Sequence, residues 1–265
     1  MRKAYLFYNP LAGEGKILED LDALEFLLDE ECVHCDMTRP ETYGEALFAM
    51  KEEDILVICG GDGTLNRFTN LTEELDLKNE ILYYPAGQHN DFARNRNRFY
   101  GCRPFPVKVM LQDLPRVRMG NREVCFLTGI CFAPNRRIRR TSKDWAAYNT
   151  PRTVTVTVDG TTHTCEKVSF AAVMHGKYCG GGLAPDPDRR PTDADLSCVL
   201  LHGCGKWQSR YLLARMQKGC QVTPRHLTIH RGRHISVNFD EPVCLCTDGE
   251  SQTGVTAFEA QAGEK

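Results

Sequence analysis

The stretch ILVICGGDGTLN, residues 55–66, decides how the rest of the chain is interpreted. Its first four residues are all apolar, which is typical of a strand buried on both faces of a sheet. Gly60, Gly61 and Gly63 follow, and they permit positive φ and let backbone N–H groups approach a ligand closely. A helix that starts at Thr64, with this hydroxyl as its N-cap, would turn its amides and positive end toward that ligand. The pattern predicts a phosphate-binding turn.

Asp62 lies inside this turn, where its carboxylate would repel a bare phosphate. It therefore either holds Mg²⁺ or orients the loop. A plain tight turn before a helix explains Gly-Gly-x-Gly as well, so the interpretation depends on the other turns of the chain.

Composition places the chain among globular proteins. Its 265 residues, 42% of them hydrophobic, are enough for one large or two modest domains. The net charge of -2 gives no sign of a nucleic-acid partner. We see no signal peptide and no apolar run as long as a membrane span, so we expect a cytoplasmic protein whose 13 cysteines stay reduced.

The first part of the chain alternates strands and helices. We expect strands at 3–8, 33–37, 55–58 and 81–84, and helices at 17–30, 42–50 and 65–75. This order predicts an α/β domain with a mostly parallel sheet, in which ligands bind beyond the carboxyl ends of the strands. The turns at 9–16, Thr38, 60–66 and 85–94 then share one rim, with Asn90 as a candidate helix cap. Four such turns together predict a nucleotide site.

From Arg116 onward the pattern becomes β-like. We expect strands at 117–119, 123–128, 153–158, 161–170, 196–201, 226–231, 234–239 and 243–246, and one helix at 207–217. Asp159-Gly160 is a good hairpin turn. We therefore predict an α/β nucleotide-binding domain at 1–114 and an antiparallel, sandwich-like acceptor-binding domain at 115–265, with the active-site cleft between them. The tail at 251–265 either packs back on the first domain or frays.

Four blocks of sequence resemble one known family. They are Asn9-Pro10 with Gly13, residues 60–66, Gly87 with residues 90–94 (NDFAR), and Asp248-Gly249-Glu250. Their order resembles the diacylglycerol kinase catalytic domain superfamily, which includes sphingosine kinases and soluble bacterial lipid kinases. NAD kinases and phosphofructokinases share the Gly-Gly-Asp-Gly-Thr turn but not the block at 90–94 or the late Asp-Gly-Glu.

The resemblance implies ATP and Mg²⁺ as cofactors. The residues it assigns to ATP are Asn9, Pro10, Gly13, Thr38, Gly60, Gly61, Asp62, Gly63, Thr64, Asn66, Gly87, Gln88 and Asn90. It further implies that Asp62 organises Mg–ATP, that Glu250 is the general base, and that Asp248 is its neighbour or metal partner. A lipid hydroxyl needs a positioned carboxylate to accept its proton, so the assignment is chemically reasonable. An ordinary Asp-Gly β-turn is the alternative.

The resemblance also implies a structural Mg²⁺ in the acidic loop after the triple glycine at 180–182. It maps to Asp193, with backbone oxygens near Arg190 and Asp195. This loop departs from the family pattern, because Ala194 stands where glycine is usual and Arg189-Arg190-Pro191 resembles an insertion. A solvated acidic loop without metal is the alternative.

The acceptor side departs further from the family. Gln88 replaces a threonine, and residues 129–133 (GICFA) replace Gly-x-Gly-Phe-Asp. The segment that follows is short and basic, with Arg136, Arg137, Arg139, Arg140 and Lys143 beside Trp145 and Tyr148. Such a run suits an anionic membrane surface or a phosphate-bearing acceptor, and equally a solvated loop.

We therefore expect an ATP-dependent kinase that phosphorylates a lipid hydroxyl as a peripheral protein at a membrane surface. One alternative is a nucleotide-binding protein with weak or no kinase activity. Another is a kinase of a soluble acceptor, with chemistry like that of NAD kinases. The sequence leaves open which lipid is used and whether the β domain forms a homodimer.

Overall fold

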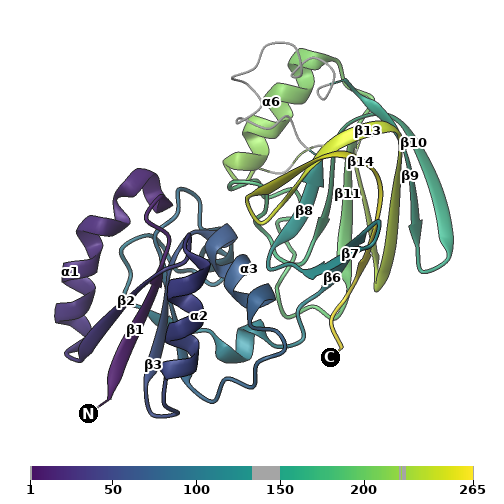
Figure 1. Cartoon of the computed structure of the whole chain (residues 1–265). Helices are drawn as coiled ribbons and strands as arrows, with labels where there is room; N and C mark the ends of the chain where they lie inside the picture. The colour runs from purple at the N-terminus through teal and green to yellow at the C-terminus, as the bar shows by residue number, and fades with distance from the viewer. Residues whose placement is uncertain (1, 133–149, 221, 223–224, 265) are drawn as a thin grey trace. The chain divides into compact units, whose positions relative to one another are not determined.

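A computed structural model describes residues 2–132, 150–220, 222 and 225–264. The chain divides into two compact units, Met1–Gln112 and Asp113–Lys265 (Figure 1). Each unit has a hydrophobic core of its own.

The first unit contains a five-stranded sheet with the order β2-β1-β3-β4-β5. Its four parallel strands are β1 (Lys3–Tyr8), β2 (Glu31–Asp36), β3 (Ile55–Gly60) and β4 (Glu80–Pro85). The short β5 (Phe105–Pro106) pairs antiparallel to β4. All six residues of β3 are buried. The predicted α/β unit with a mostly parallel sheet is thus confirmed, with β3 at its centre.

Helices cover this sheet. They are the single-turn η1 (Ala12–Gly15), α1 (Ile17–Leu28), α2 (Pro40–Ala49), α3 (Asp62–Leu71), α4 (Asp91–Arg94) and the single-turn η2 (Lys108–Leu111). The side chains of Leu21 and Leu24 on α1 join Leu6 and Val57 in the core. Phe68 of α3 packs edge-to-face on Phe7 of β1, with the ring centroids 5.7 Å apart.

Helix α3 begins three residues earlier than the predicted helix at 65–75. Gly61 is extended, with φ -89° and ψ -175°, and occupies the N-cap position, so that Asp62 is already helical. The N-cap predicted at Thr64 is therefore wrong, because the glycine alone completes the turn without a capping side chain. The first-turn amides still point out of the helix end, as they do at every helix N-terminus.

The second unit is a nine-stranded antiparallel sheet. Its strands are β6 (Arg116–Met119), β7 (Arg122–Cys125), β8 (Gly129–Phe132), β9 (Arg152–Val158), β10 (Thr161–Met174), β11 (Leu196–His202), β12 (Leu227–Gly232), β13 (His234–Thr247) and β14 (Glu250–Gln261). The order is β12-β11-β10-β8-β13-β14-β6-β7, and β9 pairs with both β10 and β13. Strands β8, β10, β9 and β13 thus form a closed ring of pairings.

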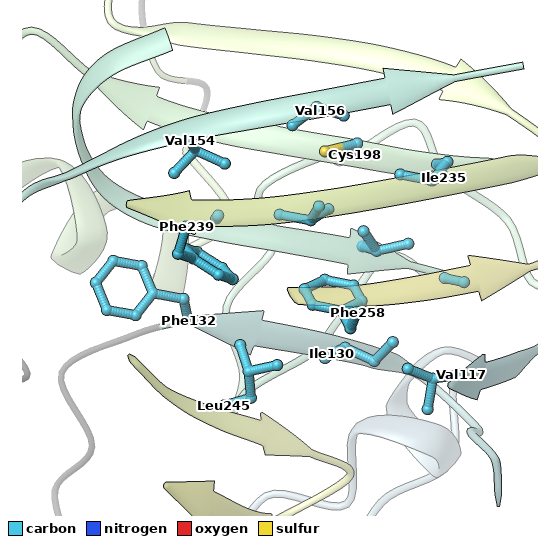
Figure 2. Packing of buried hydrophobic residues seen from close by; sticks show 14 of the residues in the cluster. Val117, Ile130, Phe132, Val154, Val156, Cys198, Ile235, Phe239, Leu245 and Phe258 are labelled. Atoms are coloured by element: carbon cyan, nitrogen blue, oxygen red, sulfur yellow. The ribbon is translucent and has the colours of Figure 1, made fainter. Parts of the chain in front are cut away.

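Alternate side chains of β10 face two different hydrophobic clusters. Ala171 and Val173 belong to the large cluster of Figure 2, which contains Ile130, Val156 and Phe258. The intervening residues of β10 face the other way, toward the helix α6 (Lys206–Gln217). This period of two is what the strand geometry requires when both faces of a sheet are covered. The predicted β-rich fold is confirmed, and Asp159-Gly160 forms the β9–β10 hairpin with both φ angles positive.

The last described part of the chain is a strand of the second unit. It forms β14, which pairs with β13 and with β6 of the second unit. The reason is the two-residue turn at Asp248 (φ +45°) and Gly249 (φ +93°), which folds the chain back on β13. The predicted strands at 234–239 and 243–246 are one strand with an irregular register between Asn238 and Val243. Among the described residues, no helix has both the length and the hydrophobicity needed to cross a membrane.

Candidate active site

Four turns lie at the carboxyl edge of the parallel sheet in the first unit. They follow β1, β2, β3 and β4, which are neighbours in the sheet. Backbone hydrogen bonds continue the pairing beyond the strands: Asn9 N donates to Cys59 O at 3.2 Å, and Ala86 N donates to Gly60 O at 2.8 Å. The structure thus brings together the turns that the sequence assigned to one rim.

Glycines let these turns touch backbone to backbone. A Cβ atom added to Gly87 would lie 2.5 Å from Gly61 Cα, and one added to Gly13 would lie 2.7 Å from Ala86 O. Neither distance is compatible with a side chain. The resulting cradle of bare backbone beside the positive end of α3 is what a phosphate group needs, so these residues fit the phosphates of ATP.

Asp62 connects the β3 turn to the β4 turn. Its Oδ2 accepts a hydrogen bond from Asp91 N at 2.7 Å, and its Oδ1 accepts one from Phe92 N at 2.9 Å. Of the two roles that the sequence left open, the geometry shows the orienting one. A carboxylate oxygen can accept a hydrogen bond and still offer a second lone pair, so the same side chain can also coordinate a bound Mg²⁺.

Asn90 is buried and does not cap α4 with its side chain. Its backbone is left-handed, with φ +52°. Its Oδ1 accepts from Gly87 N and its Nδ2 donates to Gly87 O, both at 2.8 Å. Asn90 thus holds the predicted N-cap position of α4, but its side chain closes the glycine turn and does not cap the helix. Gln88 is exposed, and its Nε2 donates to Glu14 Oε1 at 2.7 Å.

The remaining residues assigned to ATP also lie in these turns or directly after them. Thr64 is buried, with its Oγ1 3.5 Å from Asn9 Nδ2. Thr38 is exposed and donates through N and Oγ1 to Asp36 Oδ1 at 2.8 and 2.7 Å. Asn66 is half-buried on α3. Pro10 lies in the turn after β1, and Gly63 lies in the first turn of α3.

In the second unit, Asp248 and Glu250 have very different surroundings. The Asp248 carboxylate is buried and accepts hydrogen bonds from Leu127 N (2.6 Å), Thr128 N (2.9 Å) and Thr128 Oγ1 (2.7 Å). Burial raises the pKa of Asp248, although these hydrogen bonds oppose the rise. Glu250 is exposed at the start of β14. Asp248 thus fixes the hairpin, and Glu250 is the carboxylate presented to solvent.

Leu127 and Thr128 were missed by the sequence reasoning. They precede the Gly129 motif by two and one positions, but nothing in their residue types indicates a buried carboxylate partner 121 and 120 residues away. The basic run from Arg136 to Tyr148 and the altered position Ala133 lie outside the described residues.

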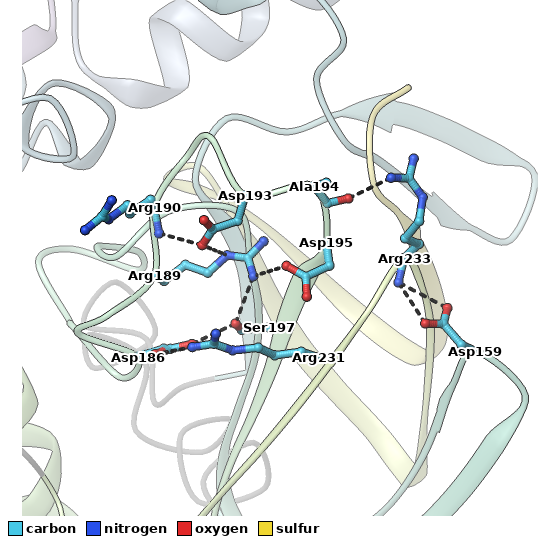
Figure 3. Close-up of polar contacts among 10 residues, drawn as sticks. All are labelled: Asp159, Asp186, Arg189, Arg190, Asp193, Ala194, Asp195, Ser197, Arg231 and Arg233. Carbon is cyan, nitrogen blue, oxygen red and sulfur yellow. Dashed lines mark hydrogen bonds and ion pairs between the residues drawn. The ribbon is translucent and has the colours of Figure 1, made fainter. Parts of the chain in front are cut away.

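The acidic loop does not fit the predicted structural Mg²⁺ (Figure 3). The Arg189 guanidinium pairs with the predicted ligand Asp193, Nε lying 3.7 Å from its Oδ2, and Nη1 lies 2.6 Å from Asp195 Oδ1. The Arg189 side chain is fully buried. Arg190 N donates to Asp193 Oδ2 at 3.0 Å, and Arg190 O accepts from Asp193 N at 3.1 Å. A side-chain cation thus compensates the charge that a metal would otherwise neutralise. The described residues contain no cluster of three or more His, Cys, Asp or Glu suited to a metal ion.

Two family models match the chain. The diacylglycerol kinase catalytic domain matches residues 3–100, and the YegS C-terminal NAD kinase beta sandwich-like domain matches residues 141–261. A diacylglycerol kinase of Bacillus subtilis (strain 168) is 29% identical over 280 residues, which cover 94% of this chain and 90% of the relative.

Two further comparisons agree with these models. A Staphylococcus aureus (strain MSSA476) protein named "Putative lipid kinase" is 31% identical, over 92% of this chain and 89% of its own length. A crystal structure of a diacylglycerol kinase from Bacillus anthracis str. Sterne superposes with a TM-score of 0.62, covering 99% of this chain and 94% of that chain at 20% identity, and supports the fold. The chain belongs to the diacylglycerol kinase catalytic domain family, a family of kinases.

Proposed function

We propose that this chain is an ATP-dependent lipid kinase of the diacylglycerol kinase type, which transfers the γ-phosphoryl group of ATP to a lipid hydroxyl. The observation that carries the proposal is the set of interlocked turns at the carboxyl edge of the first unit's sheet. Gly61 and Gly87 approach each other closely at their Cα atoms, and Asp62 anchors α4 by accepting hydrogen bonds from two backbone amides at its start.

The turn residues act by binding and orienting the nucleotide. The α3 N-terminus and the glycine turns would donate N–H groups to the phosphates, where negative charge concentrates during transfer. Asp62 and the turn residues would hold Mg–ATP, and the bound Mg²⁺ supplies charge neutralisation of the phosphates. Asn90 maintains the shape of the turn by bonding both backbone polar groups of Gly87.

Glu250 is the residue that we assign as general base. In the transfer, the oxygen of the lipid hydroxyl forms a bond to the γ-phosphorus while the bond from that phosphorus to the bridging oxygen of ADP breaks. The hydroxyl proton passes to the Glu250 carboxylate, which is exposed at the base of β14. Asp248 is a positioning residue, because its carboxylate is used by Leu127 and Thr128.

The decisive experiment measures phosphate transfer from labelled ATP with Mg²⁺ to a lipid extract in mixed micelles. Glu250→Gln keeps the shape of the side chain and removes the base, so the transfer rate should fall by about 10²-fold or more while ATP binding by calorimetry is kept. Glu259→Gln on the same strand is the matched control, because Glu259 is exposed and pairs only at the surface, with Arg118.

Each outcome has a defined meaning. An unchanged rate in Glu250→Gln would remove Glu250 from the reaction. ATP binding by the wild-type protein with no labelled lipid would favour a nucleotide-binding protein without kinase activity. Transfer to a water-soluble acceptor alone would favour chemistry like that of NAD kinases.

A further inference from the structure

Helix α6 of the second unit exposes two large aromatic side chains. Trp207 is 80% exposed and Tyr211 is 60% exposed. They are four residues apart, so they lie on the same face of the helix, one turn from each other. Leu212 and Met216, on the inner face, are buried in the cluster between α6 and the sheet. The helix is therefore held firmly by its inner face while its aromatic face points outward.

The outer face of α6 carries only positive charge. Lys206, Arg210, Arg215 and Lys218 are all exposed, and the sequence has no Asp or Glu between Asp195 and Asp240.

A cation on this face associates directly with an aromatic ring, because the Arg210 guanidinium lies 5.7 Å from the centroid of the Trp207 ring. The neighbouring Tyr211 raises the pKa of Arg215. The aromatic and the basic side chains therefore form one continuous surface, which we call the α6 face.

Two other exposed aromatic residues, Phe26 and Phe48, have the opposite environment. Phe26 of α1 and Phe48 of α2 are 90% and 94% exposed. Their helices carry acidic residues (Glu19, Asp20, Asp22 and Glu25 on α1, and Glu41 and Glu45 on α2) and no Lys or Arg. Isolated exposed phenylalanines are ordinary in globular proteins. The α6 face differs because its rings and cations favour the same partner.

We propose that the α6 face docks on an anionic lipid bilayer. Trp and Tyr are enriched at membrane interfaces because each combines an apolar ring with a polar tip, and Lys and Arg are attracted to acidic headgroups. A helix with one buried face and one aromatic, basic face can lie in the plane of that interface. The inference rests on the proposed function, since a lipid acceptor is the reason to approach a bilayer, but docking itself requires neither ATP nor catalysis.

The test is co-sedimentation of the full chain with vesicles, without nucleotide. The protein should bind vesicles made from equal amounts of phosphatidylcholine and phosphatidylglycerol, and it should bind vesicles of pure phosphatidylcholine far more weakly. High salt should dissociate it from the mixed vesicles. Lys206→Ala combined with Arg210→Ala should lower the partition coefficient by about thirtyfold, because each cation near an anionic surface contributes about fivefold. Trp207→Ala should weaken binding as well, whereas Phe48→Ala should leave it unchanged.

A spectroscopic arm reports on the α6 face directly. The chain has two tryptophans, so Trp145→Phe leaves Trp207 as the single emitter. Anionic vesicles should shift its emission to the blue, and brominated lipid should quench it.

The proposal is overturned if the α6 variants bind vesicles as the wild type does, if Trp207 emission does not respond, or if an RNA homopolymer binds in preference to vesicles. Kinase activity on lipid in detergent micelles is measured separately. If the α6 variants lose vesicle binding but keep their activity on micelles, the result supports the α6 face. If the wild type binds vesicles but has no activity on micelles, only the proposed function is contradicted.

Discussion

Gly87→Ala tests the contact on which the nucleotide site depends. Gly87 has no left-handed φ, so an alanine there suffers no backbone penalty. The new Cβ atom would, however, lie 2.5 Å from Gly61 Cα and 2.7 Å from Asn90 Oδ1. Backbone atoms cannot rotate away as a flexible side chain can, so the turns after β3 and β4 must separate.

The size of the effect follows from this overlap. Moving the Cβ atom to an ordinary contact distance requires a displacement of about 1 Å, and overpacking of that kind costs about 1–3 kcal/mol. The hydrogen bonds of Asp62 with α4 cross this junction and would lengthen, and the clash also reaches Oδ1 of Asn90, which bonds Gly87 N. If the distorted cradle loses about 1.4 kcal/mol of the binding free energy of ATP, the ATP affinity falls about tenfold.

The measurements are urea unfolding followed by circular dichroism and ATP binding followed by calorimetry. Gly44→Ala is the matched control: Gly44 lies within α2, and a Cβ atom there would meet nothing within 4 Å. We expect Gly44→Ala to be stabilising by about 0.5–1 kcal/mol, because alanine is the better helix former, and to bind ATP normally. If Gly87→Ala matches the wild type in both measurements, the contact between the turns has no part in the site.

Three further predictions concern the second unit. The unfolding temperature of the wild type should be the same in EDTA and in excess Mg²⁺, and an unfolding temperature that depends on Mg²⁺ would restore the metal site. Arg189→Met should lower the free energy of unfolding by about 1–3 kcal/mol, because it removes the cation from a half-exposed acidic pair. Asp248→Asn should destabilise by a similar amount, because one buried N–H at Thr128 or its neighbour loses its acceptor. Since burial raises the pKa of Asp248 in the folded state, its contribution to stability is present below about pH 4 and decreases as pH rises, a slope that urea titrations should find absent in the variant. Burial beside the stacked ring of His163 lowers the pKa of His230, so stability should decrease as pH falls below about 6.5, and His230→Phe should flatten that part of the profile.

Much of the fold could be predicted because its signals are local. Strand β1 has the bounds that its apolar run indicates, and the wholly buried β3 reads as a continuous apolar segment. The alternation of strands and helices implies a parallel sheet, and parallel strands place the turns that follow them at one edge. The Asp159-Gly160 hairpin follows from two residues that tolerate positive φ.

The boundaries and the end of the chain could not be predicted as well. Strand β14 has only three buried residues among its twelve, and it is stable only because β13 and β6 pair with it on either side. Helix α3 starts at Asp62 because an extended glycine can take the N-cap position, which sequence rules assign more readily to threonine.

The sequence by itself determined the class of fold, the order of its elements and the four turns that form the candidate nucleotide site, because periodicity, glycine and turn residues act over a few neighbouring positions. Only the tertiary structure decided what the charged side chains do. Asp62 accepts hydrogen bonds from amides 29 and 30 residues away, and Asp248 accepts them from a segment about 120 residues away. Arg189 pairs with Asp193, the carboxylate on which a metal was expected, and with Asp195. A carboxylate has the same appearance in a sequence whether it accepts an amide, an arginine or a metal ion, and the partner is chosen by which distant segment the folded chain brings within about 3 Å.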